Sequence, residues 1–388
     1  MRLFKKIPKQ VFLLGLISFF TDFASEMLYP VTPLFLTVTL GASMSLVGLI
    51  EGIAEVTAGL LKGYFGNLSD KLGKRSVFVV LGYGLSSLVK PLPGFIPRVS
   101  TVIISRTLDR VGKGIRTAPR DAILAANADG NTGAVFGFHR GMDTLGAVVG
   151  PLVAIALLQI FDVGYRFVYI AAIVPAVLTV IFTFTVKDPE VKKPENVKGR
   201  KYSYKEFWGI APARYKQLFI LFIVFSFVNS SDVFLILKSK NISASDSLAI
   251  GGYVFYNIVY ALVSYPIGLL SDRFGKKNIF IAGLFIFSAV YLGFAVNSSL
   301  VVIWFLFALY GIYSAANEGV IKAWVSDLIP NEYLGSAIGL LTMFSGFAIM
   351  LGSVVAGILW DKFGSAVPFL LSSIVSFVVA VLISRLKK

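Results

Sequence analysis

Apolar residues run along this chain in twelve stretches, each of about twenty residues or more, which is the length a helix needs to cross a bilayer. Short polar or glycine-containing breaks separate them. In the first half they lie at 10–38, 45–66, 76–96, 99–126, 133–158 and 164–186. In the second half they lie at 216–238, 248–270, 278–298, 300–325, 335–359 and 365–384. The pattern predicts an all-α integral membrane protein with twelve transmembrane helices.

The longest polar break separates the two sets of six. It is rich in lysine and contains two prolines, Pro189 and Pro194. We therefore predict an N-terminal six-helix bundle at 1–186, a basic linker at 187–214 and a C-terminal six-helix bundle at 215–388.

Composition agrees with a lipid-wrapped protein and argues against several function classes. Hydrophobic residues make up 56% of the 388 residues and charged residues only 15%, well below the usual share in soluble domains. The chain has no cysteine and one histidine, His139, which argues against disulfides, a zinc site and a Ser-His-Asp centre. No phosphate-binding loop motif is found. The sequence predicts neither an enzyme nor a cofactor.

The net charge of +15 reflects the membrane rather than nucleic acid. Lysine and arginine gather in alternate loops, at both chain ends and in the linker, where they face lipid headgroups and set orientation. We therefore expect both termini and the linker in the cytoplasm, and a multi-pass protein in the inner membrane of a prokaryotic cell.

The two halves repeat each other. Residues 66–75 read Gly-x-x-x-Asp-Lys-x-Gly-Lys-Arg, and residues 268–277 read Gly-x-x-x-Asp-Arg-x-Gly-Lys-Lys. The offset of 202 positions also relates Gly133 to Gly335 and Gly150 to Gly352. Parallel repeats of this size suit a transporter whose site lies between two halves, so we predict two pseudo-symmetric bundles.

This duplicated loop resembles the signature of the major facilitator superfamily, and the resemblance covers nearly the whole chain. It implies the major facilitator fold and alternating access, with the loop serving as a gate. In this interpretation Asp70 holds one conformational state, with Arg120 or Asp121 beside it. The gate residues carried over are Gly66, Asp70, Arg75, Asp121, Gly268 and Asp272.

Two elements resemble the proton-coupled drug-efflux branch of that superfamily. One is Pro-Val-x-Pro at 30–33 and the other is Gly-x-x-x-Gly-Pro at 146–151. The fourth apolar stretch resembles the family's Arg-x-x-Gln-Gly element, which implies that Arg110 lies near the proton path. Lys113 stands where Gln is usual, and an extra cation there favours an anionic or zwitterionic solute.

Acidic residues inside the apolar stretches are the candidates for proton coupling. An unpaired charge in the bilayer costs on the order of 3 kcal/mol, so such residues must face protein or water. A carboxyl balanced between burial and a nearby cation can load and release a proton. We predict proton coupling at Asp22, Glu26 and Asp143, with Arg110. The alternative is a static lattice of ion pairs, since acids and bases in these helices nearly balance.

The remaining candidates would line a solute cavity. Charged residues dominate the first half, and neutral or aromatic residues dominate the second, where tyrosines share faces of two helices. The predicted cavity residues are Glu51, Glu55, Lys113, Arg116, Arg120, His139, Arg140, Asn229, Asp232, Tyr253, Tyr256, Asn257, Tyr310, Tyr313 and Asn317.

The sequence thus predicts a monomeric secondary transporter that binds a small-molecule substrate, protons and membrane lipid, with no nucleic acid. The favoured hypothesis is a proton-coupled efflux antiporter for amphipathic, drug-like compounds. A transporter of an anionic metabolite or lipid-like solute is the alternative, and a metal-ion exporter is a weaker one because of the missing cysteine and the single histidine.

Overall fold

The computed structural model describes residues 7–127, 132–161, 163–188, 204–297, 299–329 and 331–386, apart from a few helical side chains. Among these residues the secondary structure is helical, with no strand, which confirms the all-α prediction. Most of the predicted 187–214 linker lies outside the described residues, and α10 (Tyr204–Ile210) lies at its end.

The helices of the first half follow the predicted stretches closely, although several stretches are broken in two. They are α1 (Lys9–Leu28), α2 (Val31–Leu34) with a π-helical turn (Phe35–Thr39), α3 (Met44–Leu72), α4 (Arg75–Val89), α5 (Leu92–Phe95), α6 (Val99–Ala126), α7 (Thr132–Gln159), α8 (Tyr165–Ala171) and α9 (Ile173–Thr183).

The second half is built in the same way. Its helices are α11 (Ala213–Val228), α12 (Val233–Ser243), α13 (Asp246–Phe274), α14 (Lys276–Val296), α15 (Leu300–Leu328), α16 (Asn331–Phe363) and α17 (Ala366–Ser384). Eleven segments of the described chain are long and apolar enough to cross a membrane. The twelfth predicted span is α6, a 28-residue helix that carries many charges.

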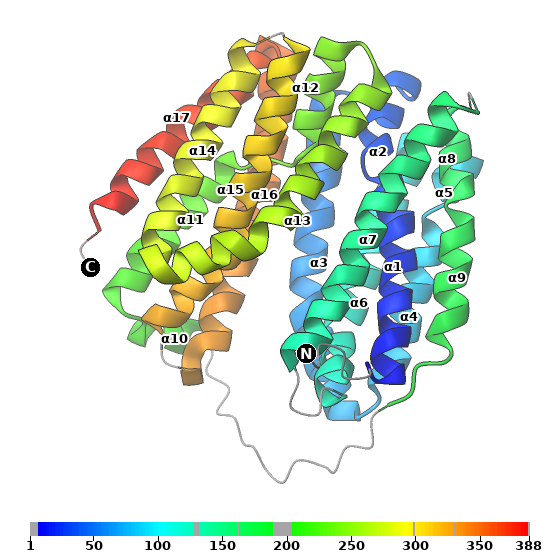
Figure 1. The fold of residues 1–388 in the computed structure, drawn as a ribbon, viewed down its shortest axis with the longest axis horizontal. Helices are drawn as coiled ribbons and strands as arrows, with labels where there is room; N and C mark the ends of the chain where they lie inside the picture. The colour runs from blue at the N-terminus through cyan, green and yellow to red at the C-terminus, as the bar shows by residue number, and fades with distance from the viewer. Residues whose placement is uncertain are drawn as a thin grey trace, which may run out of the picture. The chain divides into compact units, whose positions relative to one another are not determined.

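By packing, the chain divides into two units. The first comprises Met1–Leu40 and Thr57–Lys198, and the second comprises Gly41–Val56 and Gly199–Lys388. The beginning of α3 therefore packs with the second half, which the sequence boundaries do not anticipate. Those boundaries stay predictions. The helices of each unit are shown in Figure 1.

The same helix pairs pack in both units. In the first, α1 packs on α7 and α4 on α6; in the second, α11 packs on α16 and α14 on α15. Glycines at equivalent positions of the repeat allow equivalent close contacts. A Cβ added at Gly150 would clash with the carbonyl oxygen of Phe23, and one added at Gly352 would clash with the carbonyl oxygen of Phe227. The repeat seen in sequence therefore reappears as a repeat in backbone packing.

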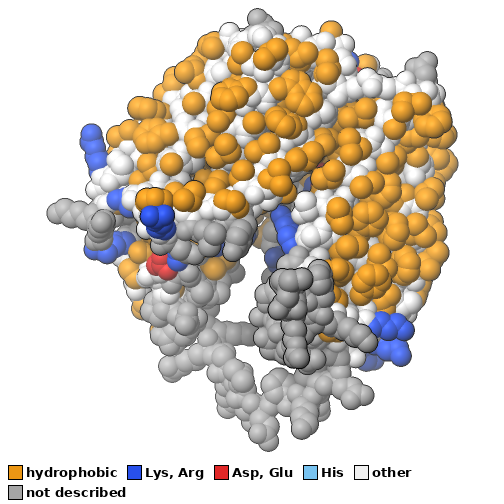
Figure 2. Space-filling view, viewed as in Figure 1, with side chains coloured by type: hydrophobic (Ala, Val, Ile, Leu, Met, Phe, Trp, Pro, Cys, Tyr) orange, Lys and Arg blue, Asp and Glu red, His pale blue; other side chains and the backbone are white. Residues whose placement is uncertain are grey.

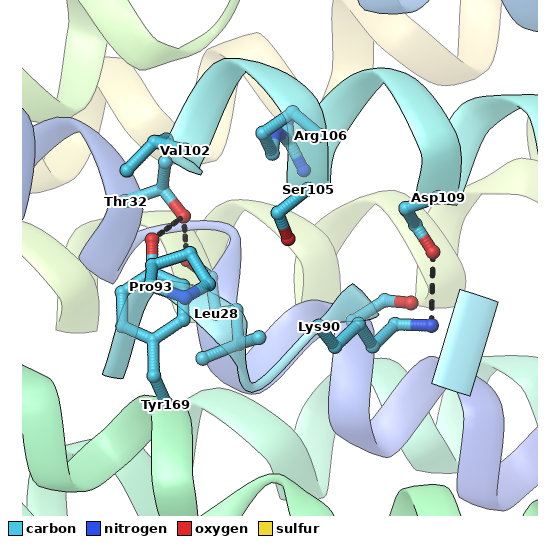
Figure 3. A pocket seen from close by; sticks show the side chains of 10 residues that line it. Leu28, Thr32, Lys90, Pro93, Val102, Ser105, Arg106, Asp109 and Tyr169 are labelled. Atoms are coloured by element: carbon cyan, nitrogen blue, oxygen red, sulfur yellow. Dashed lines mark hydrogen bonds and ion pairs between the residues drawn. The ribbon is translucent and has the colours of Figure 1, made fainter. Parts of the chain in front are cut away.

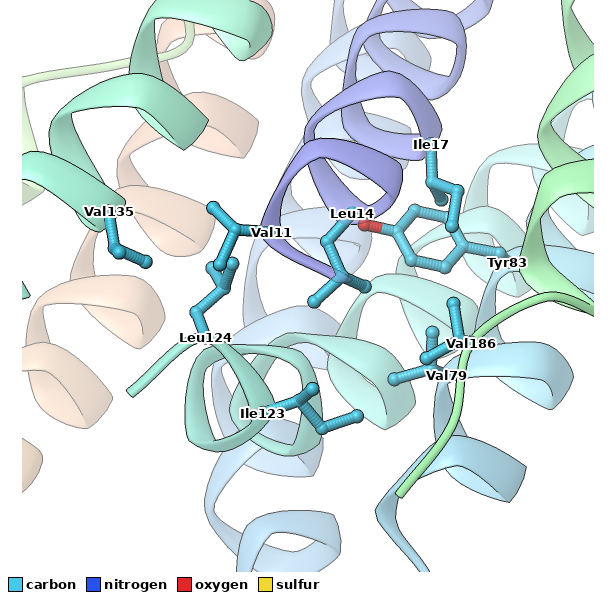
Figure 4. Packing of buried hydrophobic residues seen from close by; sticks show 9 residues of the cluster. All are labelled: Val11, Leu14, Ile17, Val79, Tyr83, Ile123, Leu124, Val135 and Val186. Atoms are coloured by element: carbon cyan, nitrogen blue, oxygen red, sulfur yellow. The ribbon is translucent and has the colours of Figure 1, made fainter. Parts of the chain in front are cut away.

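The interior and the surface of the helices are both apolar. In the first unit, one core cluster joins α1, α4, α6 and α7 (Figure 4), and its members include Val11, Leu14, Tyr83 and Ile123. Many large apolar side chains point outward instead: Val301 is 80% exposed and Leu88 is 74% exposed. Figure 2 shows hydrophobic side chains over the visible face. Only lipid can cover such a surface at low cost.

Candidate functional site

In the first unit, close packing of α4 against α6 sets the position of the charged fourth span. A Cβ on Gly82 would lie 2.6 Å from the carbonyl oxygen of Gly112 and 2.7 Å from the Cβ of Arg116. The two glycines thus let the backbones touch, as small residues do in membrane interfaces. The charged side chains of α6 are thereby held against α4.

Because the two helices are so close, Arg116 on α6 contacts two side chains of α4. Its Nη1 donates to Ser86 Oγ at 2.6 Å, and its guanidinium lies 4.4 Å from the centre of the Tyr83 ring. Arg120 donates from Nε and Nη2 to Asp121 Oδ1, at 3.0 and 2.8 Å. These two predicted cavity cations are therefore engaged within their own unit.

The predicted proton-coupling acids gather where α1 meets α7. The Gly-x-x-x-Gly element supplies the contact: a Cβ on Gly146 would lie 2.9 Å from the Phe23 backbone nitrogen and 3.2 Å from Asp22 Cβ. Asp22 interacts electrostatically with the other two acids, Asp143 and Glu26, and with two cations of α6, Lys113 and Arg116. The helix packing thus brings the three predicted acids into one electrostatic cluster, called here the acid cluster.

Asp143 has further partners. The hydroxyl group of Ser18 on α1 donates a hydrogen bond to Asp143 Oδ1, and His139 Nδ1 lies 3.7 Å from Asp143 Oδ2. His139 is buried, whereas Arg140 and Lys113 are exposed. Arg110, the predicted neighbour of the proton path, is half-buried on α6, and it interacts electrostatically with Asp109.

Sequence reasoning missed Lys90, which follows α4 and forms a buried ion pair. Lys90 Nζ lies 2.9 Å from Asp109 Oδ1, and the side chains are only 4% and 10% exposed. They line a small cavity of about 20 Å³ together with Thr32, Arg106 and Tyr169 (Figure 3). A lysine just before Pro91 inside an apolar stretch was the available signal.

Three glycines of the gate loops have a structural reason. Gly73 and Gly275, in the turns after α3 and α13, have φ of +65° and +90°, a region that favours glycine. A Cβ on Gly66 would lie 2.9 Å from Ala118 on α6, whereas Gly268 has open space around it.

The other predicted gate residues are only partly described. Arg75 begins α4, and Asp121 pairs with Arg120. The side chains of Asp70 and Asp272 lie outside the described part of the chain. Asp188, which the sequence analysis did not single out, accepts hydrogen bonds at 2.7 Å from the Ser76 backbone nitrogen and hydroxyl at the start of α4.

In the second unit, the predicted span at 216–238 is broken, and the break leaves backbone amide and carbonyl groups without helical partners. Helix α11 ends at Val228 and α12 begins at Val233. The backbone groups released by the break are paired, since Ser353 accepts from the Ser231 nitrogen at 3.1 Å and Ser372 donates to the Val228 carbonyl at 2.7 Å. Such pairing is what a broken membrane helix requires.

Next to this break lies a cavity of about 280 Å³, called here the tyrosine pocket. This volume lies close to the lower end of the range for small-molecule pockets. The predicted residues in its lining are Asn229, Asp232, Tyr256, Tyr310, Tyr313 and Asn317. The lining residues that sequence reasoning did not commit to the site include Ser226, Ser314, Glu318, Lys322, Thr342 and Ser345.

Hydrogen bonds fix several of these side chains. The Tyr310 hydroxyl donates to Asp232 Oδ1 at 2.6 Å, and the Asn317 amide donates to the Tyr313 hydroxyl at 3.0 Å. The Tyr260 hydroxyl donates to Glu318 Oε2 at 2.9 Å. The pocket wall therefore combines aromatic rings with two held carboxylates.

Other predicted cavity residues lie elsewhere. Tyr253 is buried behind the wall, with its ring 5.7 Å from that of Tyr256, and the Asn257 amide donates back to the Tyr253 carbonyl. Glu51 is buried in the part of α3 that packs with the second unit. The side chain of Glu55 lies outside the described part.

Eleven apolar spans of the described chain and the charged helix α6 form two repeated sets, with polar and charged side chains in their interior, which is the architecture of a polytopic membrane transporter. The chain belongs to the major facilitator superfamily, which matches residues 14–255 and 233–388. It is therefore a secondary transporter of a small molecule and not an enzyme. The resemblance noted in the sequence is confirmed at the level of the superfamily, while membership of the drug-efflux branch stays a prediction.

Similar proteins agree with this assignment. The chain is 35% identical to an MFS-type transporter of Methanocaldococcus jannaschii, MJ1317, over 98% of this chain and 95% of that one. The crystal structure of the nucleoside transporter NupG matches with a TM-score of 0.82 at 16% identity, covering 98% of this chain and all of the other. A D-xylose–proton symporter matches with a TM-score of 0.77 at 16% identity, over 97% of each chain. Identities this low establish the fold alone.

Proposed function

We propose that this protein is a proton-coupled antiporter that exports small amphipathic solutes. The acid cluster is the observation that carries the proposal. Asp22, Glu26 and Asp143 share one electrostatic environment inside the first unit, with Lys113 and Arg116 acting on Asp22. Like charges held together repel one another, so the proposal assigns the transported proton to one of these three carboxyl groups.

Cycling between protonated and ionised forms gives the coupling a physical basis. Protonation removes one charge from the cluster and changes how strongly it attracts the cations of α6. A state that exposes the cluster to water favours the ionised form, and a state that closes around it favours the neutral form. The D-xylose–proton symporter of the same fold is, by its name, proton-coupled. Export is supported by the efflux-like elements at 30–33 and 146–151.

The anionic-solute alternative rests on the cations of α6. Arg116 is bound to Ser86 and stacked on Tyr83, and Arg120 is bound to Asp121. Lys113, the cation that favours an anionic solute in the sequence, acts on Asp22 of the acid cluster. Cations engaged in this way are less available to a solute, so the amphipathic-solute proposal has the better support. We also propose that the protein acts as a monomer in the inner membrane of a prokaryote, with both termini in the cytoplasm.

Transport in proteoliposomes tests the proposal. Three probes would be compared under an imposed pH gradient: ethidium as a cation, anilinonaphthalene sulfonate as an anion and chloramphenicol as a neutral compound. We expect at least one probe to move faster with the gradient than without it. Asp22→Asn, Glu26→Gln and Asp143→Asn would be tested singly, and at least one should abolish the acceleration.

The matched control is Asp246→Asn, because Asp246 pairs with Lys240 at the start of α13 and belongs neither to the acid cluster nor to the lining of the tyrosine pocket. It should leave gradient-driven transport unchanged. Gradient-driven transport that survives in all three cluster variants would rule out the proton assignment.

A further inference from the structure

We propose that the tyrosine pocket recognises the cationic group of an organic amine or onium solute, with Asp232 as its counter-charge. This inference rests on the proposed export of amphipathic solutes and names their charge. It comes from the second unit, so it does not depend on which acid of the first unit carries the proton.

The charge of the lining is the first observation. Among the sixteen described residues that line the pocket, the acids are Asp232 and Glu318, and the single basic residue is Lys322. With all three ionised, the wall carries a net negative charge. A cation that enters is attracted, whereas an anion meets two carboxylates in a low-dielectric setting where repulsion is strong.

The aromatic rings are the second observation. Tyr256 and Tyr310 have ring centres 5.0 Å apart, and Tyr310 and Tyr313 have centres 5.3 Å apart, tilted by 50° and 34°. These three rings line the pocket together with Phe222, and aromatic rings attract alkylammonium and onium groups. The same faces hold the apolar part of the solute.

The position of Asp232 is the third observation. It lies at the break between α11 and α12, where the chain leaves helical geometry inside the membrane. The Tyr310 hydroxyl donates to its Oδ1, which ties the carboxylate to the aromatic wall. An acid and a ring linked in this way form one recognition unit for a cation that carries apolar substituents.

Two ions of equal shape and opposite charge give the sharpest test. Binding of radiolabelled tetraphenylphosphonium and of radiolabelled tetraphenylborate to the purified protein would be measured in separate samples, because the two ions precipitate each other. We expect the cation to bind at least about tenfold more tightly than the borate, a difference of about 1.4 kcal/mol. This comparison needs no variant. Equal binding of the two ions would overturn the inference.

Variants then locate the counter-charge. Asp232→Asn keeps the size of the side chain and an acceptor for Tyr310 but removes the charge, so phosphonium binding should weaken at least about tenfold. Asp232→Glu keeps the charge and should retain binding within a few-fold. Asp246→Asn, the control on the same helix as Tyr256, should bind like the wild type. Unchanged phosphonium binding by Asp232→Asn would contradict the assignment of Asp232 as the counter-charge.

The two proposals fail in different ways. If ethidium is ignored while a neutral or anionic probe is driven by the pH gradient, the proton-coupled function stands and the cation inference falls. If phosphonium binds through Asp232 but no probe responds to the gradient, the cation site stands and proton coupling falls.

Discussion

Single glycines decide how closely the charged helix α6 lies against α4. A Cβ added at Gly82 would clash with backbone and side-chain atoms of Gly112 and Arg116, whereas one added at Gly84, two residues later, would lie in open space. We expect Gly82→Ala to destabilise the protein by about 1–3 kcal/mol through overpacking. Gly84→Ala should be neutral or stabilising by up to about 1 kcal/mol, because alanine favours the helix. Thermal unfolding in detergent checks both, and equal melting temperatures would contradict the contact.

The buried Lys90–Asp109 pair offers a second test at this scale. Removing one partner leaves an uncompensated charge, so Lys90→Met should cost about 3–5 kcal/mol. The double variant Lys90→Met with Asp109→Asn removes both charges and should recover much of the loss. The four proteins of this cycle would be compared by thermal unfolding. Simple additivity of the two single effects would show that the side chains do not interact.

The residues of the site were predictable to different degrees. Acids inside apolar stretches stand out in the sequence, which is why Asp22, Glu26 and Asp143 were named and then found in one cluster. Partners such as Lys90, Ser18 and Ser86 could not be paired from sequence, because their contacts depend on how different helices pack. Tyr253 and Asn257 share a helix with Tyr256 but do not line the pocket. Helical spacing predicts which side chains share a face, but it does not predict which neighbouring helix or cavity that face contacts.

At the scale of elements, the ends of helices are fixed by carboxylates from distant parts of the chain. Asp361 on α16 accepts from the backbone nitrogens of Met44 and Ser45 at 3.0 and 2.9 Å, and so caps the first turn of α3. Both segments belong to the second unit. Asp188 does the same for α4 through Ser76. Capping of this kind satisfies amide groups that a helix cannot pair itself.

Hydrogen exchange tests the cap on α3. Asp361→Ala removes the acceptor, so the amides of residues 44–47 should exchange faster, by about fivefold if the cap contributes about 1 kcal/mol. Lys362→Ala, an exposed neighbour with the same loss of side chain, is the control. Exchange measured by mass spectrometry that is equally slow in both variants would show that the cap does not hold this turn.

Element positions were largely predictable, and breaks within them were not. The predicted stretch at 99–126 coincides with α6, and that at 365–384 differs from α17 by one residue at its start. The predicted spans at 10–38 and 216–238 are each divided in the structure. Hydropathy averages over a window, so it cannot show a break whose released backbone groups are paired by serines from other helices, as at Val228 and Ser231.

At the scale of the whole molecule, the duplicated sequence and the duplicated packing describe one architecture. Orientation in the membrane is the whole-molecule property that basic loops predict. The chain has no cysteine, so a single introduced thiol can be labelled without background. In intact cells, a membrane-impermeant maleimide should label Arg98→Cys and spare Lys74→Cys, both at exposed positions. The reverse pattern would place the basic loops outside.

Proton movement driven by the solute alone tests the central claim most directly. Proteoliposomes would be loaded with a transported probe and an impermeant pH dye, then diluted into probe-free buffer at the same pH. Antiport predicts that protons enter as the probe leaves, so the lumen acidifies, and that the cluster variant without coupling shows no pH change. A lumen that turns alkaline, or a wild-type protein that releases the probe with no pH change, would contradict proton-coupled antiport.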